Sequence, residues 1–288
     1  PQDKKTGGSG AVPLSRRGKV IHFTTVSSQR GRKMRGIEKI ICAGKVMEVQ
    51  RIIAPRYGAR GRGGPPERES TESTKRAHIK RAEAKLRWKL NANFQDGTDA
   101  LLTLSWKKAD APEDSAEMKK RFGNFRRRLK ARYQKAGKEM KYVATMEVGP
   151  RGSRHIHMVL SDADLQEIRE CWEPGQIVNI VPLNSKGQYA DIASYFVKYA
   201  LRTAETEGTK VGQLYTPSRN LKDPKITIRI ISRRTGFRDP KERKGYMIDK
   251  DHTVCGTYED GTAFQEISYI RLEEPEKRKR GRAAPEGR

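Results

Sequence analysis

Residues 141–160 read KYVATMEV-GPRGS-RHIHMVL and predict two strands joined by a tight turn. Val, Thr, Tyr and Ile favour strands, and the intervening residues 149–153 contain the glycines and proline typical of a turn. Side chains two residues apart in a strand lie on the same face, so His155 and His157 project together. Neutral imidazole is a common metal ligand, so this pair is a candidate metal-binding motif.

The pairing of the two strands decides where the carboxylate of Glu147 lies. If Val148 pairs with Arg154 across the turn, Glu147 stands opposite His155, with Cβ atoms roughly 4.5–5.5 Å apart. A Glu/His/His set with His157 leaves coordination positions open, as a catalytic metal requires. Its mixed donors accept Mg²⁺ or Mn²⁺, and Zn²⁺ would also bind. A half-exposed strand with two surface histidines and a solvated glutamate explains the same residues.

Residues 188–203 (QYADIASYFVKYALRT) predict an amphipathic helix. Tyr195, Lys198, Tyr199 and Arg202 fall on one stripe at i, i+3, i+4 and i+7. A tyrosine is a poor nucleophile because its free pKa is about 10, and it needs a cation or metal to favour the phenolate. Lys198 has the spacing to supply that charge. Core tyrosines with snorkelling basic side chains are the alternative.

The neighbouring segments alternate regularly between strands and helices. Further strands are predicted at residues 101–106 and 176–183, and helices at residues 118–133 and 165–172. Together with the two central strands, the order is β-α-β-β-α-β, a ferredoxin-like arrangement like the palm of RRM domains. We therefore expect an α+β fold with an antiparallel sheet and helices on one face. The tyrosine helix is expected as an addition beside the metal-bearing strand.

The rest of the chain consists of basic extensions on either side of this core. The expected divisions are a basic, partly flexible N-terminal region over residues 1–71, the core over residues 72–205, a β-containing extension over residues 206–272 and a basic tail over residues 273–288. Weaker candidate elements are apolar stretches at residues 19–26 and 39–53, a Gly/Arg/Pro-rich linker at residues 56–68, a basic helix at residues 74–90 and strands at residues 226–231 and 264–272.

Composition points to a polyanionic partner. The 288 residues carry a formal net charge of +26, and nucleic acid fits that excess better than a membrane surface does. No apolar run approaches the roughly 18 residues that span a bilayer, and no apolar leader is visible, so we expect a cytoplasmic protein. Cys42, Cys171 and Cys255 lack CxxC spacing, which excludes a zinc ribbon. No P-loop motif is present, so no ATPase of that type is fused to the core.

The residues expected to contact a nucleic-acid backbone lie on the predicted helix over residues 118–133 and near the candidate site. They are Arg126, Arg127, Arg128, Lys130, Arg132, Arg154 and Arg202.

Taken together, three motifs in this order resemble the HUH endonucleases, specifically rolling-circle replication initiators. Residues 102–105 (LTLS) resemble the family's first-strand motif, and Glu147 with residues 155–157 (HIH) resembles its metal motif. Residues 195–199 (YFVKY) resemble the nucleophile motif and are similar to the gene A replication proteins of isometric single-stranded-DNA phages. Residues 90–94 (LNANF) are similar to initiators related to the filamentous-phage gene II nicking protein. The family often has one tyrosine, so the role of the second is open.

The resemblance implies an enzyme that nicks and rejoins single-stranded or hairpin origin DNA in plasmid or phage replication. Glu147, His155 and His157 would hold Mg²⁺ or Mn²⁺. One of the two tyrosines would attack the scissile phosphate, giving a 5′-phosphotyrosine and a free 3′-OH, and Lys198 would stabilise the phenolate or the phosphate. The implied partners are a separate host helicase and a polymerase.

Two other classes of protein remain open. An HUH transposase has the same motif order, whereas a conjugative relaxase usually places its tyrosine before the histidine pair. A non-catalytic nucleic-acid-binding protein on the same fold would explain the charge but would leave the Glu/His/His face without a purpose.

Overall fold

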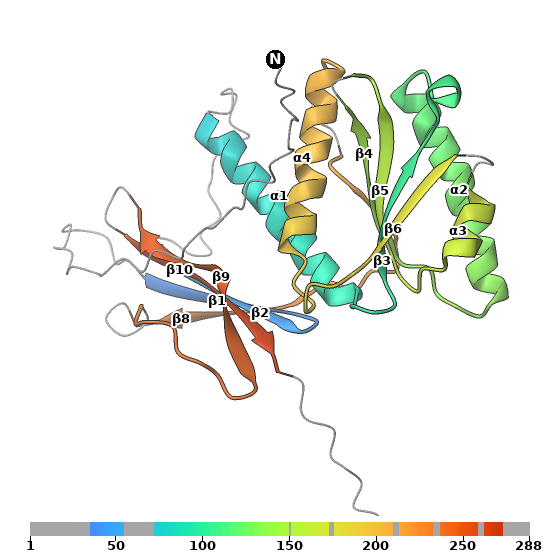
Figure 1. Cartoon of the computed structure of the whole chain (residues 1–288). Helices are drawn as coiled ribbons and strands as arrows, with labels where there is room; N and C mark the ends of the chain where they lie inside the picture. The colour runs from blue at the N-terminus through green and yellow to red at the C-terminus, as the bar shows by residue number, and fades with distance from the viewer. Residues whose placement is uncertain are drawn as a thin grey trace, which may run out of the picture.

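The computed structural model describes residues 35–54, 72–149, 151–172, 176–209, 213–232, 237–258 and 262–272. Within them the chain forms two five-stranded antiparallel sheets and four α-helices, which confirms the predicted α+β class (Figure 1). The stretch at residues 19–26, the linker at residues 56–68 and the basic tail lie outside these ranges. Within the ranges, the helices are too short or too polar for any of them to cross a membrane.

The first sheet carries the candidate site and has the strand order β6-β3-β5-β4-β7. Its strands are β3 (Ala100–Ser105), β4 (Tyr142–Val148), β5 (Arg154–Leu160), β6 (Ile177–Pro182) and the short β7 (Thr216–Pro217). Helix α2 (Ser115–Lys135) connects β3 to β4, and α3 (Leu165–Cys171) connects β5 to β6. The predicted β-α-β-β-α-β order is therefore present.

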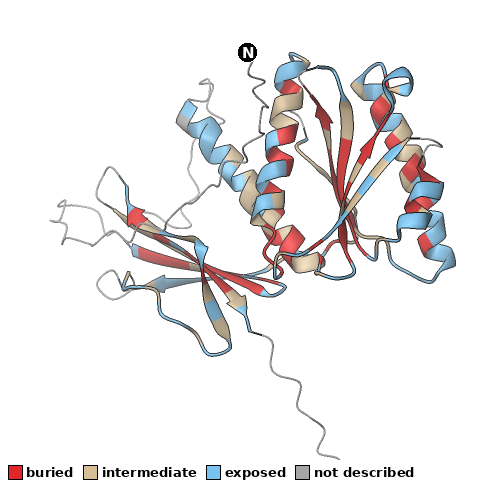
Figure 2. Cartoon of the chain, viewed as in Figure 1, coloured by how far each residue is buried: buried red, intermediate tan, exposed pale blue. Residues whose placement is uncertain are grey.

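Helices cover both faces of this sheet. Helices α2 and α3 pack on one face in a cluster that includes Leu102 and Phe125. Helices α1 (Glu72–Asn93) and α4 (Ala190–Thr206) pack on the other face, in a cluster that includes Val159. Successive strand residues point to opposite faces, so β3, β4 and β5 contribute side chains to both layers. Figure 2 shows the buried segments of these central strands in red. The two helices of the β-α-β-β-α-β order, α2 and α3, lie on one face as expected. The tyrosine helix, α4, covers the other face.

The second sheet has the order β8-β1-β2-β10-β9 and combines strands from both ends of the described chain. They are β1 (Arg35–Ala43), β2 (Val46–Ala54), β8 (Lys225–Ile231), β9 (Tyr246–Thr257) and β10 (Ala263–Arg271). The predicted stretch at residues 39–53 is a hairpin that turns at Gly44. The φ of Gly44 is +58°, and a Cβ there would lie 1.9 Å from the carbonyl oxygen of Asn91, so the turn requires glycine.

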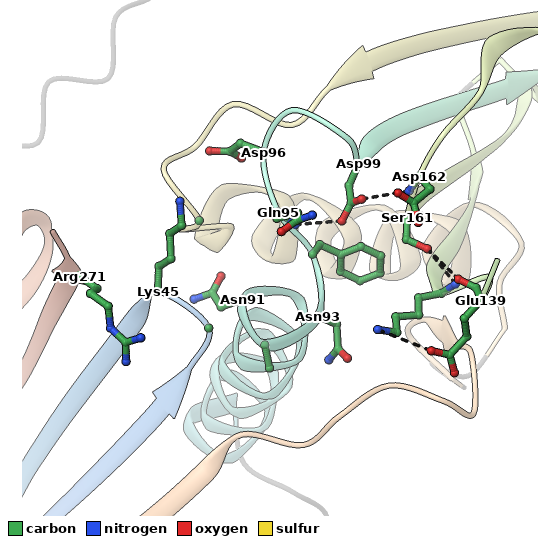
Figure 3. Close-up of a pocket in the computed structure, with 15 residues that line it drawn as sticks. Lys45, Asn91, Asn93, Gln95, Asp96, Asp99, Glu139, Ser161, Asp162 and Arg271 are labelled. Carbon is green, nitrogen blue, oxygen red and sulfur yellow. Dashed lines mark hydrogen bonds and ion pairs between the residues drawn. The ribbon is translucent and has the colours of Figure 1, made fainter. Parts of the chain in front are cut away.

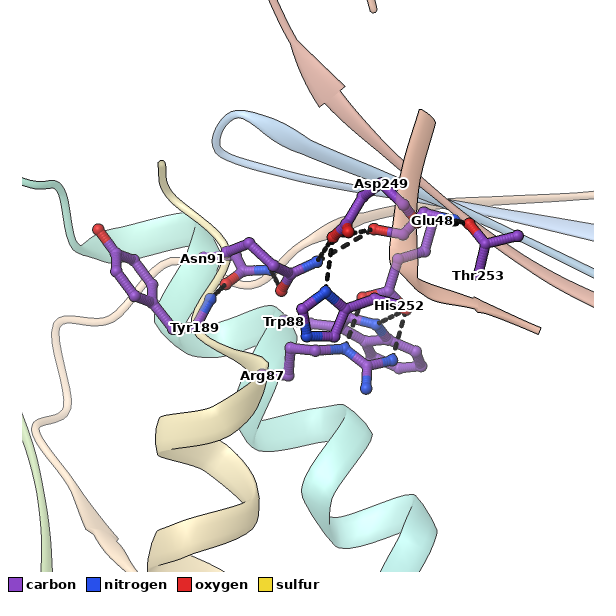
Figure 4. Close-up of polar contacts among 10 residues, drawn as sticks. Glu48, Arg87, Trp88, Asn91, Tyr189, Asp249, His252 and Thr253 are labelled. Carbon is purple, nitrogen blue, oxygen red and sulfur yellow. Dashed lines mark hydrogen bonds and ion pairs between the residues drawn. The ribbon is translucent and has the colours of Figure 1, made fainter. Parts of the chain in front are cut away.

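A buried carboxylate joins the second sheet to α1. Glu48 on β2 accepts two hydrogen bonds from the guanidinium of Arg87, at 2.6 and 2.7 Å, and one from the indole of Trp88 at 2.7 Å (Figure 4). Two-point contact between a guanidinium and a carboxylate fixes orientation as well as distance. Arg87 and Trp88 both belong to α1. Glu48 therefore fixes the position and direction of this helix relative to the second sheet.

Asn91 and Gln188 extend this connection to the start of α4. The Asn91 side-chain oxygen accepts from the backbone N–H of Tyr189 at 2.9 Å, and its Nδ2 donates to Gln188 Oε1 at 3.2 Å. Gln188 Nε2 in turn donates to Ser268 Oγ on β10 at 3.0 Å. The second sheet therefore anchors the end from which the tyrosine helix extends across the first sheet.

His252 and Asp249 on β9 form an ion pair beside this junction, with Nδ1 and Oδ2 2.7 Å apart (Figure 4). The hydrogen bond to Asp249 raises the pKa of His252 above its ordinary value. Burial raises the pKa of the Asp249 carboxyl, but the hydrogen bonds and charge of His252 together with the hydrogen bond from Gln188 outweigh burial, so the pKa of Asp249 is lowered. The pair therefore stabilises the fold when both groups are charged.

We expect His252→Gln to destabilise the protein more at pH 6 than at pH 9. The folded-state pKa of His252 is raised, so its contribution is full below the unfolded value of about 6.5 and is lost as the pH rises through the folded value. Thermal unfolding of both proteins at the two pH values measures this difference. Thr227→Ala, at an exposed position without an ionisable side chain, provides the control and should show no such pH dependence. A His252→Gln deficit of equal size at both pH values would contradict the assignment.

Candidate active site

The pairing of β4 with β5 follows the predicted register. Val148 pairs with Arg154, and Glu147 stands directly opposite His155. His157 lies two residues further along β5 and so shares the same face. This is the face that α4 covers, so the three predicted metal ligands are brought under the tyrosine helix.

Two hydroxyl groups on β3 hold the histidine rings. Thr103 pairs with His157 in the sheet, and its Oγ1 lies 3.3 Å from the Nδ1 of that ring. Ser105 pairs with His155, and its Oγ lies 2.8 Å from Nδ1. A partner on one ring nitrogen leaves Nε2 as the nitrogen available to a metal. Both hydroxyls belong to the first-strand motif LTLS, but the motif did not predict that they contact the histidine rings; polar residues at i and i+2 in an apolar strand are the signal that indicates it.

Glu147 is buried and has two partners in the site. Its Oε2 lies 2.9 Å from His157 Nε2, and its Oε1 accepts a hydrogen bond from Arg202 Nη1 at 3.0 Å. Burial lowers the pKa of His157, against the opposing effect of the Glu147 hydrogen bond. His157 is therefore neutral near pH 7, which is the form that binds metal ions.

The two tyrosines of α4 lie directly over this pair. The ring of Tyr199 stacks on His157 with 4.4 Å between centroids and an interplanar angle of 13°. The ring of Tyr195 lies 4.0 Å from that of Tyr199 and 5.7 Å from that of His157. Tyr195 is 43% exposed and Tyr199 only 7%, so Tyr195 is the tyrosine that is accessible from solvent.

A threonine fixes the distal half of α4 on β4. Thr203 Oγ1 accepts a hydrogen bond from the backbone N–H of Val148 at 2.9 Å and lies 3.1 Å from the carbonyl oxygen of Met146. These two residues flank Glu147 in the strand. The helix is therefore attached on both sides of the carboxylate, which explains the close approach of its tyrosines.

Arg202 is the cation that acts on the tyrosines in this structure. Its guanidinium carbon lies 5.8 Å from the ring centroid of Tyr199, in addition to its bond to Glu147. Burial raises the pKa of Tyr195, Glu147 raises it further and Arg202 opposes the rise. Lys198 is exposed and makes no hydrogen bond or ion pair within the described residues. Its expected role in stabilising the phenolate stays a prediction.

The predicted nucleic-acid-binding residues are spread over both faces of the first sheet. Those on α2 lie on the face opposite the tyrosines: Arg126, Arg127, Arg128, Lys130 and Arg132. Three of them make contacts that support the fold, and one of the three is Arg126, whose Nη1 donates to the Tyr142 hydroxyl. Arg128 Nε donates to the Cys171 carbonyl at 2.9 Å, and Arg132 pairs with Glu170 at 3.1 Å.

The remaining two have different surroundings. Arg154 is largely enclosed: its Nη2 donates to the Glu113 carbonyl at 2.8 Å and lies 4.0 Å from a carboxylate oxygen of Glu207. Arg202 stands at the tyrosines. Of the seven, Arg202 is therefore the one that the structure brings to the candidate site.

Within the residues that the structure describes, no three His, Cys, Asp or Glu side chains form a group that could hold a metal ion. Two of the predicted ligands are nevertheless adjacent. The 2.9 Å between Glu147 Oε2 and His157 Nε2 is close to the roughly 3 Å that separates neighbouring ligands about 2.1 Å from an octahedral ion. The ring of His155 lies 6.3 Å from that of His157, centroid to centroid. The donor types fit Mg²⁺ or Mn²⁺, and the metal stays a prediction.

A separate hollow of about 550 Å³ lies where the β1–β2 turn meets the segment before β3 (Figure 3). Two of its carboxylates, those of Asp99 and Asp96, accept hydrogen bonds from the surrounding loops. Asp99 accepts from the backbone N–H groups of Gln95 and Asp162, at 2.9 and 3.0 Å. Asp96 accepts from the hydroxyl of Tyr189 at 3.0 Å. We therefore assign these acids to loop structure rather than to chemistry.

Residues 99–204 match the family described as Replication-associated protein ORF2/gene II protein. The match covers a little over a third of the chain and includes every residue of the site, from Thr103 to Arg202. It supports the expected relation to rolling-circle replication initiators and a replication-associated function. Comparisons with curated proteins and with solved structures give no match.

Nitration of the native protein by tetranitromethane should modify Tyr195 and spare Tyr199, because only the first ring is well exposed. Trypsin cleaves after Lys198 and places the two tyrosines in different peptides, so mass spectrometry distinguishes them. Unfolded protein is the control and should be modified at both positions. Equal modification of both in the native protein would show that Tyr199 is not packed against His157.

Proposed function

We propose that this chain is a replication initiation endonuclease that nicks and rejoins single-stranded DNA through a 5′-phosphotyrosine. The main observation is the packing of Tyr195 and Tyr199 against the buried His157–Glu147 pair. The family match supports a replication-associated role, and the net charge of +26 suits a polyanionic substrate. The substrate would be single-stranded or hairpin origin DNA.

Tyr195 is our choice for the first nucleophile because it is the exposed tyrosine. Its Oη forms a bond to the scissile phosphorus as the bond from phosphorus to O3′ breaks. The tyrosine loses its phenolic proton and O3′ gains one, so the step needs no oxidant or second substrate. The products are a 5′-phosphotyrosine and a free 3′-OH, and attack by such a hydroxyl on the phosphotyrosine rejoins a strand.

Tyr199 is suited to a second transfer. Its ring is buried on His157 and lies 4.0 Å from that of Tyr195. It becomes available only when its ring leaves that stack, so it would act after Tyr195 has been consumed. Two tyrosines on one helix face allow a second strand to be cut while the first is still covalently held.

The surrounding side chains would stabilise the charges that develop on the phenolate and the phosphate during the reaction. Glu147, His155 and His157 would hold Mg²⁺ or Mn²⁺, which when bound polarises the scissile phosphate. Thr103 and Ser105 hold the imidazole rings through Nδ1. Arg202 holds the Glu147 carboxylate and places positive charge beside the tyrosines, where a phenolate and a phosphate must be stabilised.

The free 3′-OH would serve a separate polymerase as primer, and a separate helicase would unwind the duplex. The polymerase is proposed from the chemistry of the products, and the helicase from the resemblance to rolling-circle replication initiators.

A covalent-capture assay tests the function. Protein mixed with labelled single-stranded origin DNA and Mn²⁺ should give an SDS-resistant adduct that EDTA prevents. Tyr195→Phe should abolish it because the attacking oxygen is absent, whereas Tyr199→Phe should still form the first adduct. His157→Ala should abolish the adduct but retain salt-sensitive binding.

Tyr215, which lies outside α4, supplies the control, since Tyr215→Phe should leave the adduct unchanged. Salt-sensitive binding of origin DNA without any adduct would contradict the proposed enzyme and would show a non-catalytic DNA-binding protein. Adduct formation by His157→Ala would contradict the metal assignment.

Ser105→Ala should weaken Mn²⁺ binding by roughly 10–100-fold, the usual effect of removing a partner that orients a metal-bound histidine. Isothermal titration calorimetry measures the affinity directly and independently of cleavage. Thr227→Ala, at an exposed position on β8 in the other sheet, is the matched control and should bind as wild type does. Unchanged affinity in Ser105→Ala would exclude His155 as a ligand held through Nδ1.

A further inference from the structure

A hollow of about 760 Å³ lies on the face of the first sheet opposite the tyrosines. It is bounded by the outer side of α2, the turn that follows this helix, the beginning of β4 and the segment after β7. Figure 1 shows α2 and α4 on opposite sides of the sheet. The hollow is therefore separate from the candidate active site.

Five basic side chains line this hollow: Arg126, Arg127, Lys130, Lys138 and Arg219. The one acidic side chain among its lining residues, Glu139, accepts a hydrogen bond from Asn220 at 3.0 Å and lies 3.8 Å from Lys141 Nζ. None of the five pairs with a carboxylate within the described residues. Other arginines of α2 are paired: Arg121 with Glu117 at 2.6 Å, and Arg132 with Glu170.

Arg126 is the most constrained of the five cations. It is half-buried over the rings of Phe122 and Tyr142, with its guanidinium carbon 5.1 and 5.6 Å from their centroids, and Nη1 donates to the Tyr142 hydroxyl. Its Nε is buried without a hydrogen-bond partner. A half-buried guanidinium whose protein contacts are all neutral is stabilised by an anion from outside.

Asn220 provides a second unsatisfied group in the same wall. Its Nδ2 bonds to Glu139, whereas its Oδ1 is buried and has no partner. In the described part of the chain three buried side-chain atoms lack a partner, and two of them belong to residues of this hollow. Buried polar groups are normally satisfied, and the N–H at Arg126 Nε is a donor that suits a phosphate oxygen, whereas the Asn220 oxygen is an acceptor that suits a donor such as water.

We propose that this hollow binds the phosphate backbone of single-stranded DNA, as a second site in addition to the one that would be cut. Five cations without carboxylate partners around a concave surface suit successive phosphates. The aromatic lining residues, Tyr133 and Tyr142, have their rings buried in the core, so no ring is free to stack on a base. The contact therefore reads the backbone and is independent of sequence.

The hollow lies far from the candidate catalytic centre as well as on the opposite face of the sheet. Tyr142 at the hollow and Glu147 at the centre lie on the same strand, five residues apart, and project to opposite faces. At about 3.3 Å per residue this is roughly 16 Å along β4, in addition to the thickness of the sheet. A strand in this hollow is therefore a flanking or displaced segment and not the scissile phosphate.

The test is the salt-dependent binding of labelled oligo(dT), measured by fluorescence anisotropy in EDTA so that covalent chemistry does not contribute. The variant Arg127→Gln/Lys130→Gln/Arg219→Gln removes three charges from the hollow. The matched control, Lys119→Gln/Lys120→Gln/Arg169→Gln, removes three exposed charges from α2 and α3 outside it. Circular dichroism verifies that both variants are folded.

The hollow variant should bind more weakly than the control, and the slope of log K against log salt should fall by about 0.7 for each phosphate that the variant no longer binds. Equal affinity and slope in the two variants would overturn the proposal. Inorganic phosphate and dTMP serve as competitors, each added at the same concentration of phosphate groups as the oligo(dT). Displacement of oligo(dT) by either competitor would show a site for free phosphate or for a nucleotide instead. Because no cleavage is measured, either result leaves the nicking function to be decided by the capture assay.

Discussion

The antiparallel register of β3, β5 and β4 is the constraint on which the rest of the site depends. Strand side chains alternate with a period of two, so one register places His155 and His157 on the α4 face and Ile156 and Met158 in the core beneath α2. A shift of one residue would exchange these sets and bury two imidazoles among apolar side chains. The packing of the core and the geometry of the site are therefore determined by the same pairing.

The tyrosine helix is held in position by both sheets. Its start is held by Asn91 and Gln188, through which the second sheet contacts the helix N-terminus. Its distal half is held by Thr203, which bonds to the backbone on either side of Glu147. The second sheet thus contributes to the geometry of the candidate site without providing a side chain to it, because a helix fixed at two points has little freedom to shift along the first sheet.

Electrostatics separates the two faces of the first sheet. On the α4 face, one buried carboxylate is shared between His157 and Arg202, and burial keeps the imidazole neutral and the Tyr195 phenol protonated. On the α2 face, the cations around the hollow have no carboxylate partners among the described residues. At the candidate catalytic centre the positive and negative groups are paired, whereas the hollow beside α2 carries an excess of positive charge. Paired charges suit a site of proposed chemistry, and excess positive charge suits a site that is proposed only to contact phosphates.

The sequence by itself determined the four longer strands of the first sheet, whereas the pairing of the short β7 with β4 was decided by the tertiary structure. The β-α-β-β-α-β order and the stripe of Tyr195 and Tyr199 follow from local periodicity, which depends on neighbouring residues alone. The register that faces Glu147 with His155 followed on the condition that Val148 pairs with Arg154 across the turn, and the structure has that pairing. Only the tertiary structure joined β1 and β2 to β8, β9 and β10, because pairing between strands some 200 residues apart leaves no local pattern. It also decided that Arg202 bonds to Glu147 while Lys198 faces solvent, and that the basic side of α2 turns away from the tyrosines. These contacts and orientations depend on how the helices pack against the sheet. The spacing of residues along a helix does not specify that packing.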